Sequence, residues 1–216
     1  TGIFTEDFLE YLGGLRFTGS VRAIPEGRIF FTGEPSIEVT APVIEAQLAE
    51  TFILNQINLQ TILATKASRC VWAARGRILT DFASRRAQGV DAALKMARSS
   101  YIAGFQSTSN VLAAQRYGIP PAGTMAHSFI SCFTAETDAF RAYAAAFPDR
   151  TVLLLDTYDT IEGARRAVEV ARELEAAGHR LLAVRLDSGD FESLSRNVRR
   201  ILDEAGLNYV RILASG

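Results

Sequence analysis

The spacing of hydrophobic positions changes along this chain, and each change marks a different kind of element. From residue 77 onward, short apolar runs alternate with amphipathic stretches. Runs such as 151–156 and 181–186 are almost continuously apolar, which is typical of strands buried on both faces of a parallel sheet. The stretches between them repeat apolar residues every three or four positions, which indicates helices. The pattern over 77–216 therefore predicts six successive β/α units of an α/β fold.

The expected strands and helices of these units alternate along the chain. The strands are expected at 77–82, 104–106, 121–124, 151–156, 181–186 and 209–213. The helices are expected at 90–102, 110–117, 127–147, 160–177 and 191–205. About eight units usually close a β/α barrel, so we expect a barrel that is incomplete in this chain. A doubly wound open sheet is the competing fold, but no GxGxxG-type turn follows the first strand.

The first 44 residues have another pattern. A short amphipathic helix is expected over 8–12, and three strand-like runs follow at 20–24, 28–32 and 36–40, separated by Pro and Gly. We interpret 1–44 as the β-rich part of a small N-terminal α/β domain. A long helical pattern then begins near Pro42 and makes 45–76 a connecting helix, which leaves 77–216 for the barrel. The chain begins with Thr1 and stops just after a strand-like run, so we expect both ends to be cuts through a longer protein.

Composition narrows the function classes. The 216 residues are 48% hydrophobic, and 23 Lys and Arg balance 24 Asp and Glu, which argues against a nucleic-acid-binding surface. No apolar run is long enough to span a bilayer, and no signal peptide is visible, so we expect neither a membrane nor a nucleic-acid partner. Cys70 and Cys132 are far apart and form no metal-binding pattern, which favours reduced thiols in a cytoplasmic protein.

Polar and charged residues gather where the expected strands end, which is where β/α barrels carry their catalytic groups. The strand-end segments are 81–86, 107–110, 123–128, 156–160, 185–190 and 214–216. They offer arginines and helix N-termini for anions, carboxylates for Mg²⁺ or a developing cation, and one histidine. This inventory favours chemistry on phosphorylated sugars. A sugar-phosphate isomerase or aldolase would need a Lys or Glu base at a strand end, and none is present there.

The two histidines of the chain lie in different settings. His127 follows a Gly-Thr turn at a strand end, where an imidazole can act as a base, a nucleophile or a phosphoryl acceptor. A buried structural histidine is the alternative at this position. His179 follows Gly178 and is expected to lie at a solvated helix end.

Five ordered segments carry a resemblance to a known family: 81–89, 107–113, 123–128, 156–160 and 185–190. Together they resemble nicotinate phosphoribosyltransferases, which are type II phosphoribosyltransferases. The resemblance implies an N-terminal α/β domain and an irregular β/α barrel. It also implies that nicotinate and phosphoribosyl pyrophosphate form nicotinate mononucleotide in NAD biosynthesis. Mg²⁺ as cofactor, ATP as co-substrate, a phosphohistidine, a homo-oligomer and a cytoplasmic location are further implications.

The resemblance also assigns roles to single residues. It implies that His127 is catalytic and accepts the phosphoryl group of ATP, and that Asp156 and Asp187 are catalytic and bind either the ribose hydroxyls or Mg²⁺. Substrate-binding roles fall on Phe82, Arg85, Ser109, Thr124, Ser128, Arg185 and Ser188. Among these, Phe82 would stack on the pyridine ring, Arg85 would hold a phosphate, and Arg185 would pair with the nicotinate carboxylate.

Two alternatives remain open at this point. The first is a related enzyme that uses nicotinamide or quinolinate, although Ser109 is neutral where nicotinamide-using relatives carry an aspartate. The second is a non-catalytic fragment. The family's N-terminal tyrosine motif and glycine-rich phosphate loops are not found in these residues, so we expect this segment alone to be inactive.

Overall fold

The computed structural model describes residues 2–216 and divides the chain into two compact units, 1–122 (unit 1) and 123–216 (unit 2). Each unit contains its own cluster of buried apolar side chains. The division falls inside the segment 77–216, within which the sequence predicts one run of β/α units.

Unit 1 begins with a helix and a β-hairpin. Helix α1 spans Glu6–Gly14, and strands β1 (Ser20–Ala23) and β2 (Ile37–Thr40) pair in antiparallel fashion. The strand expected at 28–32 is not formed, so this prediction is wrong. Two tight turns, over 25–28 and 31–34, lie at the two ends of the segment instead, closed by the amides of Arg28 and Glu34, which donate to carbonyls three residues earlier. These turns leave no extended run for a third strand to pair with.

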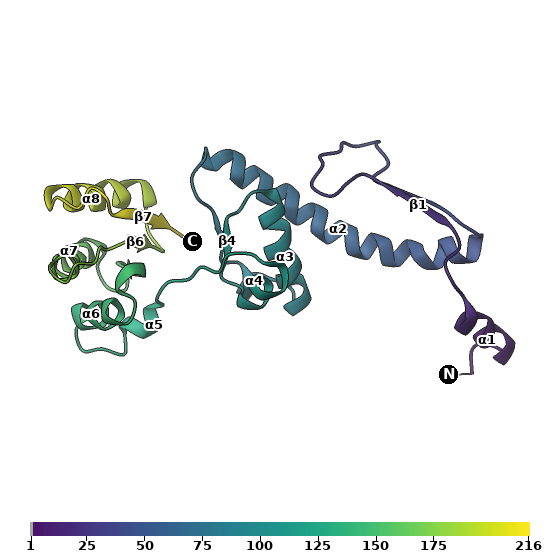
Figure 1. The fold of residues 1–216 in the computed structure, drawn as a ribbon, viewed down its shortest axis with the longest axis horizontal. Helices are drawn as coiled ribbons and strands as arrows, with labels where there is room; N and C mark the ends of the chain where they lie inside the picture. The colour runs from purple at the N-terminus through teal and green to yellow at the C-terminus, as the bar shows by residue number, and fades with distance from the viewer. Residues whose placement is uncertain (1) are drawn as a thin grey trace. The chain divides into compact units, whose positions relative to one another are not determined.

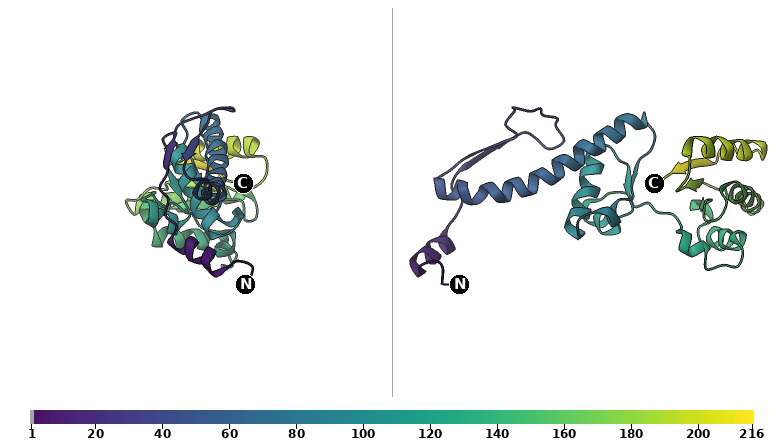
Figure 2. Two further views of the ribbon diagram at one scale, coloured as in Figure 1. Left: turned by 90° about the vertical axis from the view of Figure 1, so that its right-hand side faces the viewer. Right: turned by 180° about the vertical axis from the view of Figure 1, so that it is seen from behind.

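The connecting helix predicted from Pro42 is present as α2, Val43–Ala74. It packs against α3 (Val90–Ala103), and the β1–β2 hairpin runs alongside its N-terminal half (Figures 1 and 2). Ala67 is the one buried residue among the 32 of this helix. Despite the length of α2, no helix within residues 2–216 is apolar enough over its length to cross a membrane.

The rest of unit 1 contains short parallel strands. Strands β3 (Thr80–Asp81) and β4 (Ser107–Thr108) pair in parallel, with the short helix η1 (Ser84–Arg86) and α3 between them and α4 (Val111–Tyr117) after them. The strand expected at 121–124 is reduced to one bridge between Thr108 and Pro121. Two consecutive prolines lack the N–H groups that a longer ladder needs.

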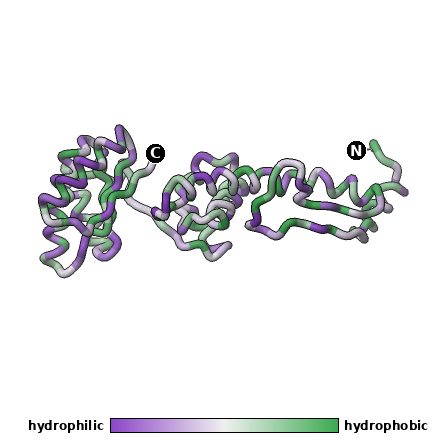
Figure 3. Tube along the Cα trace, turned by 90° about the horizontal axis from the view of Figure 1, so that it is seen from above, coloured by the Kyte–Doolittle hydropathy of each residue, from purple (hydrophilic) through white to green (hydrophobic). Residues whose placement is uncertain are grey.

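Unit 2 combines three parallel strands with helices. The elements are α5 (His127–Ile130), α6 (Glu136–Ala146), η2 (Pro148–Arg150), β5 (Val152–Leu154), α7 (Thr160–Ala176), β6 (Ala183–Leu186), α8 (Phe191–Glu204) and β7 (Arg211–Ala214). The strands form a parallel sheet in the order β5-β6-β7. Helices α6, α7 and α8 pack against one another in that order along the sheet (Figure 1). Their colours alternate between hydrophilic and hydrophobic along the tube in Figure 3, as expected for helices with one buried face.

The single helix expected over 127–147 is two helices, α5 and α6. The Ser131 hydroxyl and the Cys132 thiol each donate to a helix carbonyl four residues earlier. Such side-chain bonds compete with the backbone ladder and favour a helix end. Across the described residues the parallel strands form two separate sheets, β3–β4 and β5-β6-β7, so the incomplete barrel has no closed ring of strands.

Candidate functional site

Polar side chains from three neighbouring strands meet at one edge of the sheet in unit 2. Asp156 lies just beyond β5, Asp187 follows β6, and Ser215 follows β7. The strands are parallel and in register, with Leu154 opposite Arg185. Their carboxyl ends therefore lie side by side, which brings residues far apart in the sequence together.

Arg185 is the centre of this cluster. Its side chain leaves β6 on the face opposite that of the neighbouring buried Leu186, because successive strand residues alternate. The guanidinium donates from Nη2 to Asp187 Oδ1 (2.5 Å), from Nε to Ser215 Oγ (2.7 Å) and from Nη1 to Thr124 Oγ1 (2.7 Å). The planar fork thus ties the loop before α5 to two strand ends.

Asp187 is held ionised by these neighbours. Ser215 Oγ donates to the same Oδ1 at 2.6 Å. Partial burial opposes ionisation, but the hydrogen bonds from Ser215 and Arg185 and the positive charge of Arg185 outweigh it, so the pKa of Asp187 is lowered. The other carboxylate oxygen, Oδ2, remains for His127.

Asp156 is more deeply placed. Its side chain is only 3% exposed, and Oδ2 accepts from the Asp187 amide (3.0 Å) and the Ser188 hydroxyl (2.5 Å). The other oxygen, Oδ1, is buried and has no hydrogen-bond partner. An unpartnered buried carboxylate oxygen is costly, so this atom is a candidate for binding a cation or a donor group.

His127, the first residue of α5, faces both carboxylates. Its Nε2 lies 3.4 Å from Asp187 Oδ2 and 4.0 Å from Asp156 Oδ1, while Nδ1 lies 3.1 Å from Thr157 Oγ1. A carboxylate can only accept, so the neutral tautomer that suits both contacts has its proton on Nε2. The lone pair then lies on Nδ1, where the Thr157 hydroxyl can donate to it. The side chain is 43% exposed and therefore reachable by a substrate.

The remaining predicted site residue of unit 2, Ser128, is exposed on α5. The other histidine, His179, lies after α7, and its Nδ1 contacts Asp149 Oδ1 at 2.8 Å. The predicted helix-end position of His179 is confirmed, with the addition of this surface partner.

Three predicted site residues lie in unit 1, at the ends of β3 and β4. Phe82 is half-buried directly after β3, Arg85 is exposed on η1, and Ser109 follows β4. The Ser109 amide donates to the carbonyl of Asp81 at 2.7 Å, which links the two strand ends. These residues therefore share one edge of the β3–β4 sheet.

The described residues include no cluster of three or more His, Cys, Asp or Glu suited to a metal. Asp156 and Asp187 form a pair of carboxylates at one sheet edge, and Asp156 Oδ1 is unpartnered. Mg²⁺ often takes one or two carboxylates and completes its shell with water and substrate phosphates. The pair of carboxylates therefore fits a Mg²⁺ site of this kind. It does not fit a site in which every metal ligand comes from the protein.

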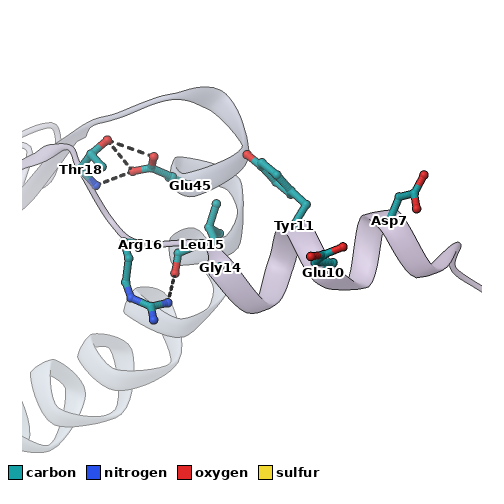
Figure 4. A pocket seen from close by; sticks show the side chains of 8 residues that line it. All are labelled: Asp7, Glu10, Tyr11, Gly14, Leu15, Arg16, Thr18 and Glu45. Atoms are coloured by element: carbon teal, nitrogen blue, oxygen red, sulfur yellow. Dashed lines mark hydrogen bonds between the residues drawn. The ribbon is translucent and has the colours of Figure 1, made fainter.

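A recess of unit 1 beside α1 offers a different environment (Figure 4). Three carboxylates, those of Asp7, Glu10 and Glu45, line it together with Arg16. Glu45 already accepts from the amide and hydroxyl of Thr18. An acidic recess repels phosphorylated substrates, so the strand ends are the better candidates for such chemistry.

Sequence reasoning gave no role to Thr157, Ser215 or Asp81, although all three lie in the predicted strand-end segments. The available signal was their position in those segments. The missing information was the side-chain geometry, because sequence spacing does not show which hydroxyl reaches which ring nitrogen or carboxylate.

Two family models match the chain. The nicotinate phosphoribosyltransferase N-terminal domain matches residues 1–58, and the nicotinate phosphoribosyltransferase family matches residues 78–215. Nicotinate phosphoribosyltransferase pncB2 of Mycobacterium tuberculosis is 55% identical over 216 residues, covering 99% of this chain and 46% of that protein. Nicotinate phosphoribosyltransferase of Bacillus subtilis is 45% identical, covering 98% of this chain and 43% of that protein.

Solved structures agree. Human nicotinic acid phosphoribosyltransferase matches with a TM-score of 0.89 at 32% identity, over 98% of this chain and 53% of that one. Nicotinate-nucleotide pyrophosphorylase from Pyrococcus furiosus matches with a TM-score of 0.84 at 28% identity, over 93% of this chain and 52% of that one. The chain spans about half the length of the relatives it matches.

Proposed function

The chain belongs to the nicotinate phosphoribosyltransferase family, and on this premise we propose that the protein transfers the phosphoribosyl group of phosphoribosyl pyrophosphate to nicotinate. The products are nicotinate mononucleotide, a precursor in NAD biosynthesis, and pyrophosphate. The observation that carries the proposal is the meeting of His127, Arg185 and two carboxylates at one sheet edge.

The carboxylates suit the charge that develops during transfer. The bond between the anomeric carbon and pyrophosphate breaks with its electron pair going to pyrophosphate, and the ring nitrogen of nicotinate supplies the pair for the new bond. Positive charge builds on the sugar between these events. Asp187, kept ionised by its neighbours, and the buried Asp156 would stabilise it electrostatically or bind the ribose hydroxyls.

Asp156 and Asp187 are also the residues that would hold Mg²⁺. The ion would supply positive charge to the departing pyrophosphate oxygens. The unpartnered Asp156 Oδ1 supports this assignment, since a cation would satisfy it.

His127 would couple the reaction to ATP hydrolysis. Its Nδ1 lone pair would attack the γ-phosphorus, and the bond to the bridging oxygen would break to release ADP. The Nε2 proton would stay on the ring, facing Asp187, whose negative charge would stabilise the phosphorylated imidazole. The added phosphate charge would then help to organise the second substrate.

We assign substrate-binding roles to residues of each unit. Phe82 would stack on the pyridine ring and Arg85 would hold a phosphate, and the neutral Ser109 would not repel the nicotinate anion. In unit 2, the nicotinate carboxylate would pair with Arg185, with Thr124, Ser128 and Ser188 as further polar contacts. Arg185 already binds Thr124 and Asp187, so its pairing with nicotinate would adjust the position of Asp187 at the same time.

We also propose an oligomeric enzyme in the cytoplasm. The two cysteines are free and exposed, which fits a reducing compartment. Many large apolar side chains of unit 1 are exposed, which fits association with a further copy.

The decisive experiment supplies phosphoribosyl pyrophosphate and Mg²⁺ with nicotinate, nicotinamide or quinolinate, each with and without ATP. We expect nicotinate mononucleotide as the main product and faster turnover with ATP. A preference for nicotinamide or quinolinate would replace the proposed acceptor. Absence of turnover with all three, in a folded protein of full family length, would contradict the proposal.

A further inference from the structure

Asp81, the last residue of β3, carries a buried carboxylate with both oxygens in use. The residue is 4% exposed. Oδ1 accepts from the Ala83 amide at 2.9 Å, and Oδ2 accepts from the Thr108 hydroxyl at 2.8 Å. Both donors are neutral, so this carboxylate forms no ion pair with them. Its two hydrogen bonds fix the positions of a backbone amide and of a side-chain hydroxyl.

The Ala83 bond shapes the loop that follows β3. Ala83 lies between Phe82 and η1, which carries Arg85. A carboxylate that accepts from an amide two residues later closes an Asx-type turn. Asp81 therefore fixes the direction in which the chain leaves β3. It thereby fixes the backbone positions of Phe82 and Arg85 in the loop that follows.

The Thr108 bond connects this loop to the next strand end. Thr108 is fully buried, and its hydroxyl accepts from the Asn110 amide at 3.0 Å while donating to Asp81. The Ser109 amide donates to the Asp81 carbonyl. One hydrogen-bonded chain thus runs from Ala83 through Asp81 and Thr108 to Asn110 and holds the segment of Ser109 beside that of Phe82.

We propose that Asp81 is a positioning residue that sets the substrate-binding loop of Phe82 and Arg85 against that of Ser109. The inference rests on the proposed function for the identity of the substrates. A shift of about 1 Å in such groups can lower a rate about a hundredfold, so a remote hydrogen bond can control binding and turnover. Asp81 itself needs no contact with either substrate.

The first test asks whether Asp81 holds the loops, independently of activity. Amide hydrogen exchange is compared in the wild-type protein, Asp81→Asn and the control Asp91→Asn, which makes the same chemical change at an exposed residue that pairs with Lys95. The carboxamide introduced by Asp81→Asn keeps an acceptor for the Ala83 amide, but its NH₂ group can only donate, so the bond from the Thr108 hydroxyl can persist only in the reverse direction. The negative charge that strengthens both bonds is lost in either case. We expect faster exchange at Ala83 and at 109–110 in Asp81→Asn alone. Wild-type exchange at these amides in Asp81→Asn would overturn the proposal.

The second test asks whether the held geometry serves binding. Asp81→Asn is expected to raise KM for nicotinate about tenfold or more, with a smaller change in kcat, since Phe82 and Arg85 contact substrates. In a Phe82→Leu background, Asp81→Asn should raise KM by a smaller factor than it does in the wild type. The effects of two substitutions are not additive when one residue acts through the other. If Asp81→Asn raised KM by the same factor in both backgrounds, the proposal that Asp81 acts through Phe82 would be contradicted.

A gentler pair of variants covers the case in which Asp81→Asn does not fold. Thr108→Val removes the hydroxyl, and Thr108→Ser keeps it. We expect Thr108→Val to reproduce the exchange and KM changes and Thr108→Ser to restore them towards wild type. Equal behaviour of the two would overturn the proposal. If the wild type lacks turnover, the proposed function fails, whereas the exchange experiment still decides the role of Asp81.

Discussion

At the scale of single residues, the environment of His127 separates its chemistry from that of His179. His127 has a hydroxyl at one ring nitrogen and carboxylates near the other, whereas His179 has only a surface aspartate. We expect His127→Ala to abolish ATP-coupled turnover while the midpoint of thermal unfolding changes little, because the side chain is nearly half exposed.

The measurement is the acid-labile phosphoryl adduct that forms with ATP. It should be present in the wild type and in His179→Ala and absent in His127→Ala. An adduct on His179, or unchanged coupling without His127, would refute the assignment.

A second residue-scale prediction concerns Glu136, whose side chain is fully buried at the start of α6. Burial raises the pKa of its carboxyl, although Arg166 opposes this from 2.7 Å, and the charges of Asp156 and Asp159 raise it further. The folded protein therefore binds this proton more tightly than the unfolded chain does. The stabilisation is complete below the unfolded pKa of about 4.3 and is lost as pH rises through the folded pKa.

Glu136→Gln removes this titration. We expect the free energy of unfolding of wild type, minus that of Glu136→Gln, to fall as pH rises through this window and then to level off. Urea denaturation of both proteins over a pH series provides the measurement. A difference that does not vary with pH would show that Glu136 has the same pKa in both states.

The sequence predicted most of the segments that form the candidate site. It predicted few of the contacts between the side chains of those segments. The strand-end pattern located His127, Asp156, Arg185 and Asp187 because parallel strands present their carboxyl ends at one edge. The direct bond between Arg185 and Asp187 depends on rotamers that the pattern does not encode. The link from Asp81 to Thr108 was equally invisible, since these residues lie 27 positions apart.

At the scale of elements, α7 lies close to the end of β5 at Gly163. A Cβ atom at this position would overlap the carbonyl oxygen of Leu155. We expect Gly163→Ala to destabilise the protein by about 3 kcal/mol, because α7 or the chain after β5 would have to move. Glu169→Ala places the same residue on the exposed face of α7 and should change stability by about 0.5 kcal/mol or less.

Chemical denaturation of both variants measures the contrast. If Gly163→Ala were as stable as Glu169→Ala, the close approach of α7 to β5 would be wrong.

The sequence predicted helices and strands correctly where the hydrophobic periodicity was strong. It failed where local hydrogen bonds determined the structure. The helices expected at 160–177 and 191–205 are confirmed as α7 and α8, since each has a clear buried stripe and an aspartate cap. The strand expected at 28–32 is absent because two turns use its backbone groups. The helix expected over 127–147 is interrupted because Ser131 and Cys132 bond to helix carbonyls.

At the scale of the whole molecule, the chain carries extensive exposed apolar surface. Trp72 is 85% exposed and Phe52 is 67% exposed, both on α2, and Ile29 and Phe31 of the hairpin loop are also exposed. Surfaces of this kind associate with other protein surfaces or aggregate. We therefore expect the 216-residue chain to bind a hydrophobic dye and to self-associate as its concentration rises.

Light scattering and dye fluorescence test this expectation. The double variant Phe52→Lys, Trp72→Lys should lower both signals, whereas Gln47→Lys, at an exposed polar position of α2, should not. A wild-type chain that stays monomeric at high concentration and binds no dye would contradict the prediction.

The order β5-β6-β7 has a consequence for how unit 2 is made. Each strand pairs with the one synthesised immediately before it, so the sheet can grow as the nascent chain leaves the ribosome. The carboxylates of Asp156 and Asp187 emerge early in this sequence, but Ser215 arrives only with β7. During synthesis, the hydrogen bonds of Asp187 are therefore completed only when β7 docks on β6. The candidate site at this sheet edge is fully assembled at that point.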